Sequence, residues 1–192
     1  PLYDALAWPF VHASTQVAIA ELADLPPGSR VLEVGVGTGL ALAALTEALP
    51  IAGEGMDQSP GMMEIARARL PASRLFQGEA ESIPVSNDQY AAVLYSYVFR
   101  HIKPAGVNQV LGEASRVLVP GGRAIVTDFW LPLMGVGLAL AANTQILGIW
   151  SLHDPNTLAE RAKAFGLVAE RIEYPPFSFT LTLRKAGLNS VL

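Results

Sequence analysis

Cysteine is absent from this sequence of 192 residues, and histidine is rare, with only three. The chain can therefore form no disulfide, no cysteine-ligated zinc site and no thiol nucleophile. Because His12, His101 and His153 lack the spacing of metal ligands, we expect no bound metal. Basic residues are also few: 13 against 17 acidic residues give a formal net charge of -4. Without a general basic surface, nucleic acid is not expected as the principal partner.

Internal repeats, linkers and low-complexity tracts are missing as well. The composition, 51% hydrophobic and 16% charged, is that of a globular protein, and 192 residues suffice for one buried core. We expect a single domain over residues 1–192. The first residues contain no basic segment that leads into an apolar run, so the sequence predicts no signal peptide and a cytoplasmic protein.

Short apolar runs alternate with longer helical patterns along residues 30–128, and prolines stand at the boundaries between them. Strands that alternate with helices predict an α/β fold, a doubly wound Rossmann-like sheet that is mostly parallel. The expected strands are residues 30–34, 52–56, 74–77, 91–95 and 124–128, and the expected helices are residues 40–49, 60–70 and 105–118.

The two ends of the chain predict further elements. A helix is expected to begin at Asp154 and to end at Gly166. Strands at residues 168–174 and 177–183 flank a pair of prolines and predict an antiparallel hairpin at the edge of the sheet. Before the first strand, residues 11–23 predict an N-terminal leader helix.

A glycine-rich loop joins the first expected strand to the following helix. Gly35, Gly37 and Gly39 occupy alternate positions, and such a loop lets a ligand approach the backbone closely. The pattern predicts a nucleotide-like ligand. The dinucleotide fingerprint has its third glycine at the position of Leu40, so the match to that class is poor.

Two acidic residues accompany the loop. Glu33 precedes the first glycine and suits a ligand with a cationic end better than a pyrophosphate. Asp57 follows the second expected strand, where a carboxylate is placed to accept hydrogen bonds from the two hydroxyls of a ribose. The alternative is a glycine turn with two surface carboxylates and no ligand.

Four segments, in the right order, resemble the class I S-adenosylmethionine-dependent methyltransferases. Residues 33–39 have the Glu-x-Gly-x-Gly-x-Gly motif of the small members, and residues 55–63 are similar to the second-strand segment that holds the ribose. Residues 78–84 are similar to the segment that meets the adenine, and residues 118–122 to the turn before the fifth strand. The resemblance implies that S-adenosylmethionine is the cofactor and S-adenosylhomocysteine its product.

The resemblance also implies roles for single residues. Glu79 would face the exocyclic amine of the adenine, the Ala80 amide a ring nitrogen, and Tyr3 the methionine carboxylate. The family usually has Asp in place of Glu79, and often another Asp in place of Ala91, whose loss affects local packing more than cofactor binding. The implied cofactor-binding residues are Tyr3, Glu33, Gly35, Gly37, Gly39, Asp57, Gln58, Met62, Glu79, Ala80, Ser96 and Tyr97.

Methyl transfer from a sulfonium is a direct displacement, and the protein mainly aligns the reacting atoms, which contributes ~7–11 kcal/mol. Arg100 and His101 follow the fourth expected strand, and ligands collect at the carboxyl ends of parallel strands. Their segment is similar to one in ubiquinone and menaquinone C-methyltransferases, whose Arg is proposed to assist ring deprotonation. His101 is suited to act as a base for a phenol or hydroxyl. The alternative is a loop Arg and a helix-capping His.

Residues 129–150 contain no charged residue. The stretch is long enough to cross a membrane, but its prolines, glycines and polar residues argue against a span. We expect a lid that is a buried helix, an apolar substrate tunnel or a surface touching a membrane. Such a lid suggests an apolar acceptor, for example a prenylated quinone or a lipid amine. The glycine loop is also similar to that of bacterial phospholipid N-methyltransferases.

The sequence therefore predicts S-adenosylmethionine-dependent methyl transfer to a small apolar or aromatic acceptor, a quinone-like compound, a phenol or a lipid amine. Peripheral membrane contact is compatible with such an acceptor. Two alternatives remain: a non-catalytic module that binds S-adenosylmethionine, and a nicotinamide-dependent oxidoreductase, which Glu33 and Leu40 disfavour.

Overall fold

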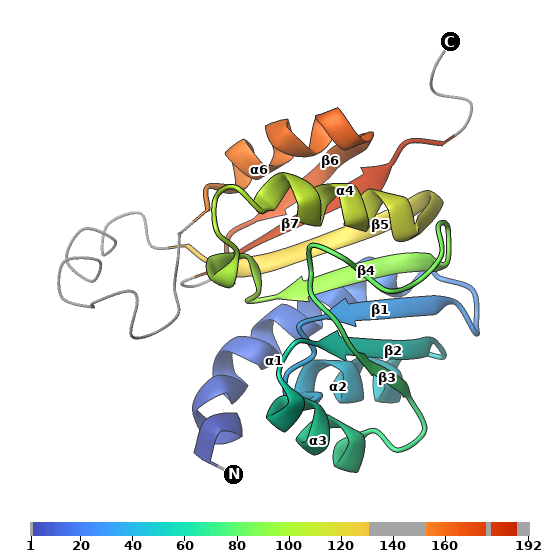
Figure 1. Cartoon of the computed structure of the whole chain (residues 1–192), viewed down its shortest axis with the longest axis vertical. Coiled ribbons are helices and arrows are strands. Elements are labelled where there is room, and N and C mark those ends of the chain that lie inside the picture. The colour runs from blue at the N-terminus through green and yellow to red at the C-terminus, as the bar shows by residue number, and fades with distance from the viewer. Residues whose placement is uncertain (1, 131–152, 176–177, 188–192) are drawn as a thin grey trace, which may run out of the picture.

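The computed structural model describes residues 2–130, 153–175 and 178–187. Its strands are β1 Arg30–Val34, β2 Ala52–Asp57, β3 Arg74–Gln77, β4 Tyr90–Ser96, β5 Leu118–Phe129, β6 Leu167–Glu173 and β7 Ser178–Lys185. They form one sheet in the order β3-β2-β1-β4-β5-β7-β6 (Figure 1). Strands β1 to β5 pair in parallel, whereas β7 runs antiparallel to both of its neighbours. The expected mostly parallel sheet with a C-terminal hairpin at its edge is confirmed.

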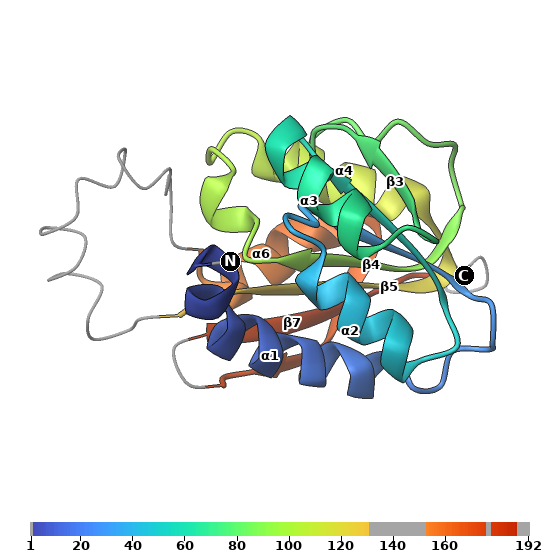
Figure 2. The ribbon, with the colours of Figure 1, turned by 90° about the horizontal axis from the view of Figure 1, so that it is seen from below.

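Helices cover both faces of the sheet. They are α1 Leu2–Leu22, α2 Leu40–Ala48, α3 Pro60–Arg69, α4 Val107–Val117 and α6 Pro155–Ala162, with short 3-10 helices η1 Phe99–His101 and η2 Lys163–Phe165. Figure 2 shows α1 and α2 on one side of the sheet and α4 on the other. Helix α3 lies beside α2, and α6 packs against α4. This is the expected doubly wound arrangement.

Local sequence signals set several helix ends. The Ser59 hydroxyl accepts the Met62 N–H at 3.4 Å at the start of α3, and the Asp154 carboxylate accepts the Thr157 N–H at 2.7 Å at the start of α6. A proline follows each of these N-caps, where its missing N–H is not needed. After η2, Gly166 has a φ of 69°, the left-handed conformation that ends a helix.

Two elements are longer than the sequence predicts. Helix α1 begins at Leu2 rather than at residue 11. Strand β5 begins at Leu118 rather than at residue 124, because the Pro-Gly-Gly segment continues the strand and pairs Leu118 with Tyr90 across a register irregularity. Neither extension follows from apolar periodicity, because both depend on partners elsewhere in the chain.

The alternating polar residues of β7 are buried, like its apolar ones. Ser178, Thr180 and Thr182 are only 3%, 1% and 1% exposed. Helix α1 contacts β7, and the Thr180 and Thr127 hydroxyls lie 3.0 Å apart. Strand β7 therefore has two buried faces, one apolar and one lined by hydroxyls, of which that of Thr180 is within hydrogen-bond distance of Thr127.

The expected lid falls largely beyond these elements. Of residues 129–150, only Phe129 and Trp130 belong to the described part of the chain; the remainder lie outside it. Among the described residues, no helix has both the length and the apolar character needed to cross a membrane.

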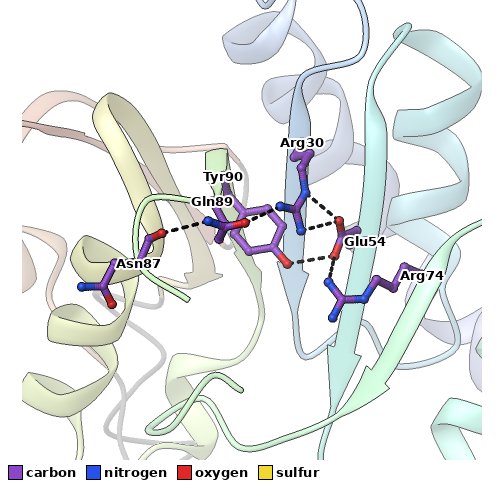
Figure 3. Close-up of polar contacts among 6 residues, drawn as sticks. All are labelled: Arg30, Glu54, Arg74, Asn87, Gln89 and Tyr90. Carbon is purple, nitrogen blue, oxygen red and sulfur yellow. Dashed lines mark hydrogen bonds and ion pairs between the residues drawn. The ribbon is translucent and has the colours of Figure 1, made fainter. Parts of the chain in front are cut away.

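A buried carboxylate joins four strands at their amino ends (Figure 3). Glu54, 7% exposed, accepts hydrogen bonds from Arg30 at 2.9 Å, Arg74 at 3.0 Å and the Tyr90 hydroxyl at 2.9 Å. Burial and the hydrogen bond to Glu54 raise the pKa of Tyr90 to about 12, so the hydroxyl remains a donor. The Arg30 guanidinium also lies over the Tyr90 ring, 4.7 Å from its centroid. Tyr90 is the residue before Ala91, the position at which the family often has Asp. The Glu54 cluster therefore supplies polar contacts at this end of β4.

We predict that Glu54→Gln lowers the free energy of unfolding by about 1.5–3 kcal/mol, the usual worth of hydrogen bonds to a charged group. Arg74→Ala removes an exposed partner and should cost less than about 1 kcal/mol. Urea unfolding of both variants measures the difference. If the two variants lost the same free energy of unfolding, the burial of Glu54 would not determine the strength of these contacts.

Candidate active site

A cavity of about 690 Å³ lies at the carboxyl ends of the parallel strands. In Figure 1 the arrowheads of β1, β2 and β4 point to this same edge of the sheet. Eleven of the fourteen site residues expected from the sequence line the cavity: Glu33, Gly35, Gly37, Asp57, Gln58, Met62, Ala80, Ser96, Tyr97, Arg100 and His101. The topology thus brings together residues spread over nearly seventy positions of the chain.

The glycine loop has a backbone conformation that residues with a side chain rarely adopt. The φ angles of Gly35 and Gly37 are +74° and +54°. A Cβ atom on Gly35 would lie 2.4 Å from Val98 Cγ2, whereas one on Gly37 would meet nothing closer than 4.0 Å. Gly35 therefore permits close packing against the η1 segment, and Gly37 leaves its side of the cavity open for a ligand.

Asp57, at the end of β2, holds this loop in place. Its Oδ2 accepts the Gly37 N–H at 2.9 Å, and its Oδ1 accepts the Ser59 N–H at 2.8 Å. Each carboxylate oxygen can accept a further hydrogen bond. Asp57 therefore fixes the loop relative to the start of α3 and still presents acceptor capacity to the cavity that it lines.

Two of the expected cofactor-binding residues do not line the cavity, and their contacts with the cofactor stay predictions. Gly39 does not line the cavity; a Cβ atom there would lie 2.8 Å from Leu70 Cδ1, so this glycine serves the close packing of the loop against α3. Glu79 is exposed and also does not line the cavity, because the turn closed by the Ser82 N–H and the Glu79 carbonyl brings Glu81 there instead. No sequence pattern indicated that Glu81 lines the cavity.

The third exception is Tyr3, whose side chain lies outside the described part of the structure. A neighbouring residue of α1 does reach the glycine loop: Asp4 accepts the Thr38 hydroxyl at 2.9 Å and pairs with Arg69. Arg69 also donates to the Thr38 carbonyl at 2.7 Å. Burial raises the pKa of Asp4, but the hydrogen bonds from Arg69 and Thr38 outweigh it and hold the pKa below its ordinary value. No sequence pattern indicated this contact.

Glu33 is a buried carboxyl group that lines the cavity beside the glycine loop. It is 1% exposed, with hydrogen bonds from Ser96 and from the Leu42 backbone. In the part of the chain that the structure describes, its Oε2 has no hydrogen-bond partner. Burial raises the pKa of Glu33 to about 8. A cationic group of a ligand would compensate the charge that burial disfavours.

Another part of the cavity is formed by aromatic rings and Arg100. The Arg100 guanidinium lies 5.3 Å from the centroid of the Tyr97 ring and 4.9 Å from that of Phe129. Tyr97 has a positive φ of 59°, a strained conformation for a bulky residue. His101 is exposed but lines the same cavity. This part of the cavity, called the acceptor end below, combines apolar surface with a cation and an imidazole.

This geometry agrees with the comparisons with known proteins. Residues 31–122 match the model of a methyltransferase domain family. The demethylmenaquinone methyltransferase of Clavibacter sepedonicus is 31% identical over 190 residues, 94% of this chain and 72% of that protein. The chain belongs to the class I S-adenosylmethionine-dependent methyltransferases. The glycine loop, Glu33 and Asp57 are thus parts of a methyltransferase domain.

Other methyltransferases resemble the chain over different lengths. A 2-phytyl-1,4-naphtoquinone methyltransferase of Thermosynechococcus vestitus is 32% identical over 69% of this chain, and the chain covers 61% of it. The demethylmenaquinone methyltransferase of Renibacterium salmoninarum is 32% identical over 57% of this chain and 45% of its own length. The chain therefore spans about half to three quarters of these three relatives.

Solved methyltransferase structures share the fold. A protein of Galdieria sulphuraria, described as a putative sarcosine dimethylglycine methyltransferase, has a TM-score of 0.76 at 15% identity and covers 90% of this chain, which covers 84% of it. A geranyl diphosphate methyltransferase in complex with S-adenosylmethionine has a TM-score of 0.76 at 14% identity, with 91% and 79% covered.

We predict that Asp57→Ala weakens S-adenosylmethionine binding by about 1.5–3 kcal/mol, because a charged hydrogen-bond acceptor is lost from the cavity. Isothermal titration calorimetry measures the change. Glu64→Ala is the matched control, since this acid is exposed on α3 and does not line the cavity, and it should leave affinity unaltered. Unchanged affinity in a folded Asp57→Ala protein would remove Asp57 from the cofactor site.

We also predict that Glu33 makes the stability of the ligand-free protein depend on pH. The raised pKa means that the folded state holds the proton more tightly than the unfolded state. The free energy of unfolding should therefore fall as pH rises from about 4.5 to about 8 and level off above it. Glu33→Gln should lack this decrease. Urea unfolding across this range compares the two proteins, and parallel curves would contradict the prediction.

Proposed function

We propose that the chain transfers the methyl group of S-adenosylmethionine to a small apolar or aromatic acceptor by in-line displacement. The observation that carries this proposal is the single cavity that extends from the glycine loop to Arg100. At about 690 Å³ it falls within the size range of small-molecule sites. One cavity of this kind can hold the cofactor and the acceptor in contact.

The residues at the glycine-loop end fit the cofactor. We infer that Glu33 faces its cationic amino group, because the buried Oε2 has no partner among the described residues and a cation would stabilise its charge. Asp57 has acceptor capacity for the ribose hydroxyls, and Gly37 leaves room beside the backbone. The Met62 side chain and the backbone of Ala80 are proposed to contact the adenine. When bound, S-adenosylmethionine supplies a methyl group already activated by the positive sulfur.

The chain itself has to align the acceptor and to exclude water. Tyr97, Val98, Ile102 and Phe129 give the acceptor end apolar walls that displace water from the reacting atoms. His101 is proposed as the base for acceptors that carry a proton, since an imidazole nitrogen can accept a proton and this residue lines the cavity. No nucleophile of the protein is required.

A quinone-like or phenolic acceptor is supported by two observations. Aromatic rings line the acceptor end, and two relatives are named as quinone methyltransferases. A prenylated acceptor would dissolve in a membrane, and a peripheral contact with that membrane is part of the proposal. The half-exposed Trp8 on α1 and Tyr174 after β6 are apolar surface residues suited to it.

We predict that longer alkyl tails on a phenol acceptor lower its Michaelis constant. Burial of apolar area contributes ~25 cal/mol per Å², or about 0.8 kcal/mol for each fully buried methylene. A turnover series with alkylphenols kept below their micelle concentration measures this effect, with cofactor affinity as the control that should not change.

Three outcomes would contradict the proposed function. A flat response to tail length would show that apolar burial does not select the acceptor. Binding of S-adenosylmethionine without turnover of any phenol, quinol or amine would favour the non-catalytic module. Binding of NAD in place of S-adenosylmethionine, measured by the same calorimetry, would favour an oxidoreductase.

A further inference from the structure

Arg100 is fixed in position by three neighbours. Its side chain is 17% exposed, and its guanidinium contacts the rings of Tyr97 and Phe129. Its backbone N–H donates to Asp128 Oδ2 at 2.8 Å, which ties η1 to the end of β5. Rings and carboxylate together restrict the rotamers of a long side chain, and a guanidinium held in this way loses little freedom when it binds a ligand.

The guanidinium nevertheless retains unused hydrogen-bonding capacity. Its Nη1 is buried and has no hydrogen-bond partner among the described residues. The distance from Nη1 to Asp128 Oδ1 is 3.8 Å, which is too long for a hydrogen bond. Asp128 Oδ1 is engaged instead by the Phe129 N–H at 2.8 Å. Asp128 thus balances the charge of Arg100 without satisfying its donor, and a buried unsatisfied donor is costly.

Charge is divided along the cavity. The acidic residues that line it, Glu33, Asp57 and Glu81, come from the β1, β2 and β3 side of the sheet. Arg100 is the only arginine or lysine among the described lining residues, and it follows β4, on the side of β1 away from β2 and β3. A guanidinium stays protonated in proteins, so Arg100 cannot itself accept a proton, and its planar donors match an anionic oxygen.

We propose that Arg100 determines acceptor specificity by binding an anionic oxygen, a phenolate or a carboxylate attached to an aromatic ring. Asp128, Tyr97 and Phe129 are positioning residues for this guanidinium. The inference rests on the proposed function, because it concerns the acceptor end of the same cavity. In this role Arg100 binds the ionised acceptor, and another group removes the proton of an acceptor that carries one.

Two probes of equal shape test the inference on the whole chain saturated with S-adenosylhomocysteine. 2-Naphthoate carries an anionic oxygen pair, and 2-naphthamide is its neutral counterpart. Calorimetry should show naphthoate binding at least about tenfold more tightly, the effect expected for a hydrogen bond to a charged group. Arg100→Met should remove this preference and leave naphthamide binding unchanged, and Arg100→Lys should retain part of it.

Arg67→Met is the matched control, because this arginine is exposed on α3 and does not line the cavity. It should keep the full preference for naphthoate. Thermal unfolding and S-adenosylhomocysteine affinity of each variant report whether the fold and the cofactor end are intact. If Arg100→Met does not fold, the comparison of the two probes on the wild-type protein still decides the matter.

Three results would overturn the inference: the wild-type protein binds the two probes equally well, it binds neither probe at millimolar concentration, or a folded Arg100→Met protein keeps the full preference for naphthoate. Its failure differs from failure of the proposed function. Turnover of phenols without any preference for anionic probes would reject the role of Arg100 alone. If the protein prefers naphthoate but transfers a methyl group to no acceptor, the anion-binding role of Arg100 stands and the proposed enzymatic function is rejected.

Discussion

The Asp57 carboxylate accepts the backbone N–H groups of Gly37 and Ser59, and the geometry of the candidate site depends on these two hydrogen bonds. They hold a loop with left-handed glycines beside the end of β2 and the start of α3. The loop in turn packs on η1, which carries Arg100. Loss of this anchor would therefore affect both ends of the cavity and not the cofactor end alone.

Acidic residues and Arg100 both line the cavity, and burial raises the pKa of Glu33 and that of Asp128, which lies beside Arg100. Desolvation dominates for Glu33 and also for Asp128, where the Arg100 guanidinium opposes part of it. Such groups are stabilised when a ligand brings the missing charge. A cationic cofactor would bring that charge to Glu33, whereas Arg100 already brings it to Asp128 and keeps its Nη1 donor for an anionic acceptor.

Contacts between distant parts of the chain close the site. Asp4 and Arg69 lie 65 residues apart, yet their ion pair joins α1 to the glycine loop through Thr38. At the opposite end of the strands, Glu54 links β1, β2, β3 and β4. The sheet is thus held by charged contacts at its amino ends, while its carboxyl ends are left to bind ligands.

The sequence by itself determined the strands, most helices, the glycine loop and the place of Asp57, because periodicity, N-caps and glycine spacing act within a few residues. It also predicted that Arg100 and His101 lie at the site, since parallel strands end at one edge. Only the tertiary structure decided that Gly39 packs on α3, that Glu81 replaces Glu79 at the cavity, and that both faces of β7 are buried. These outcomes depend on which elements lie side by side, and no local pattern carries that information.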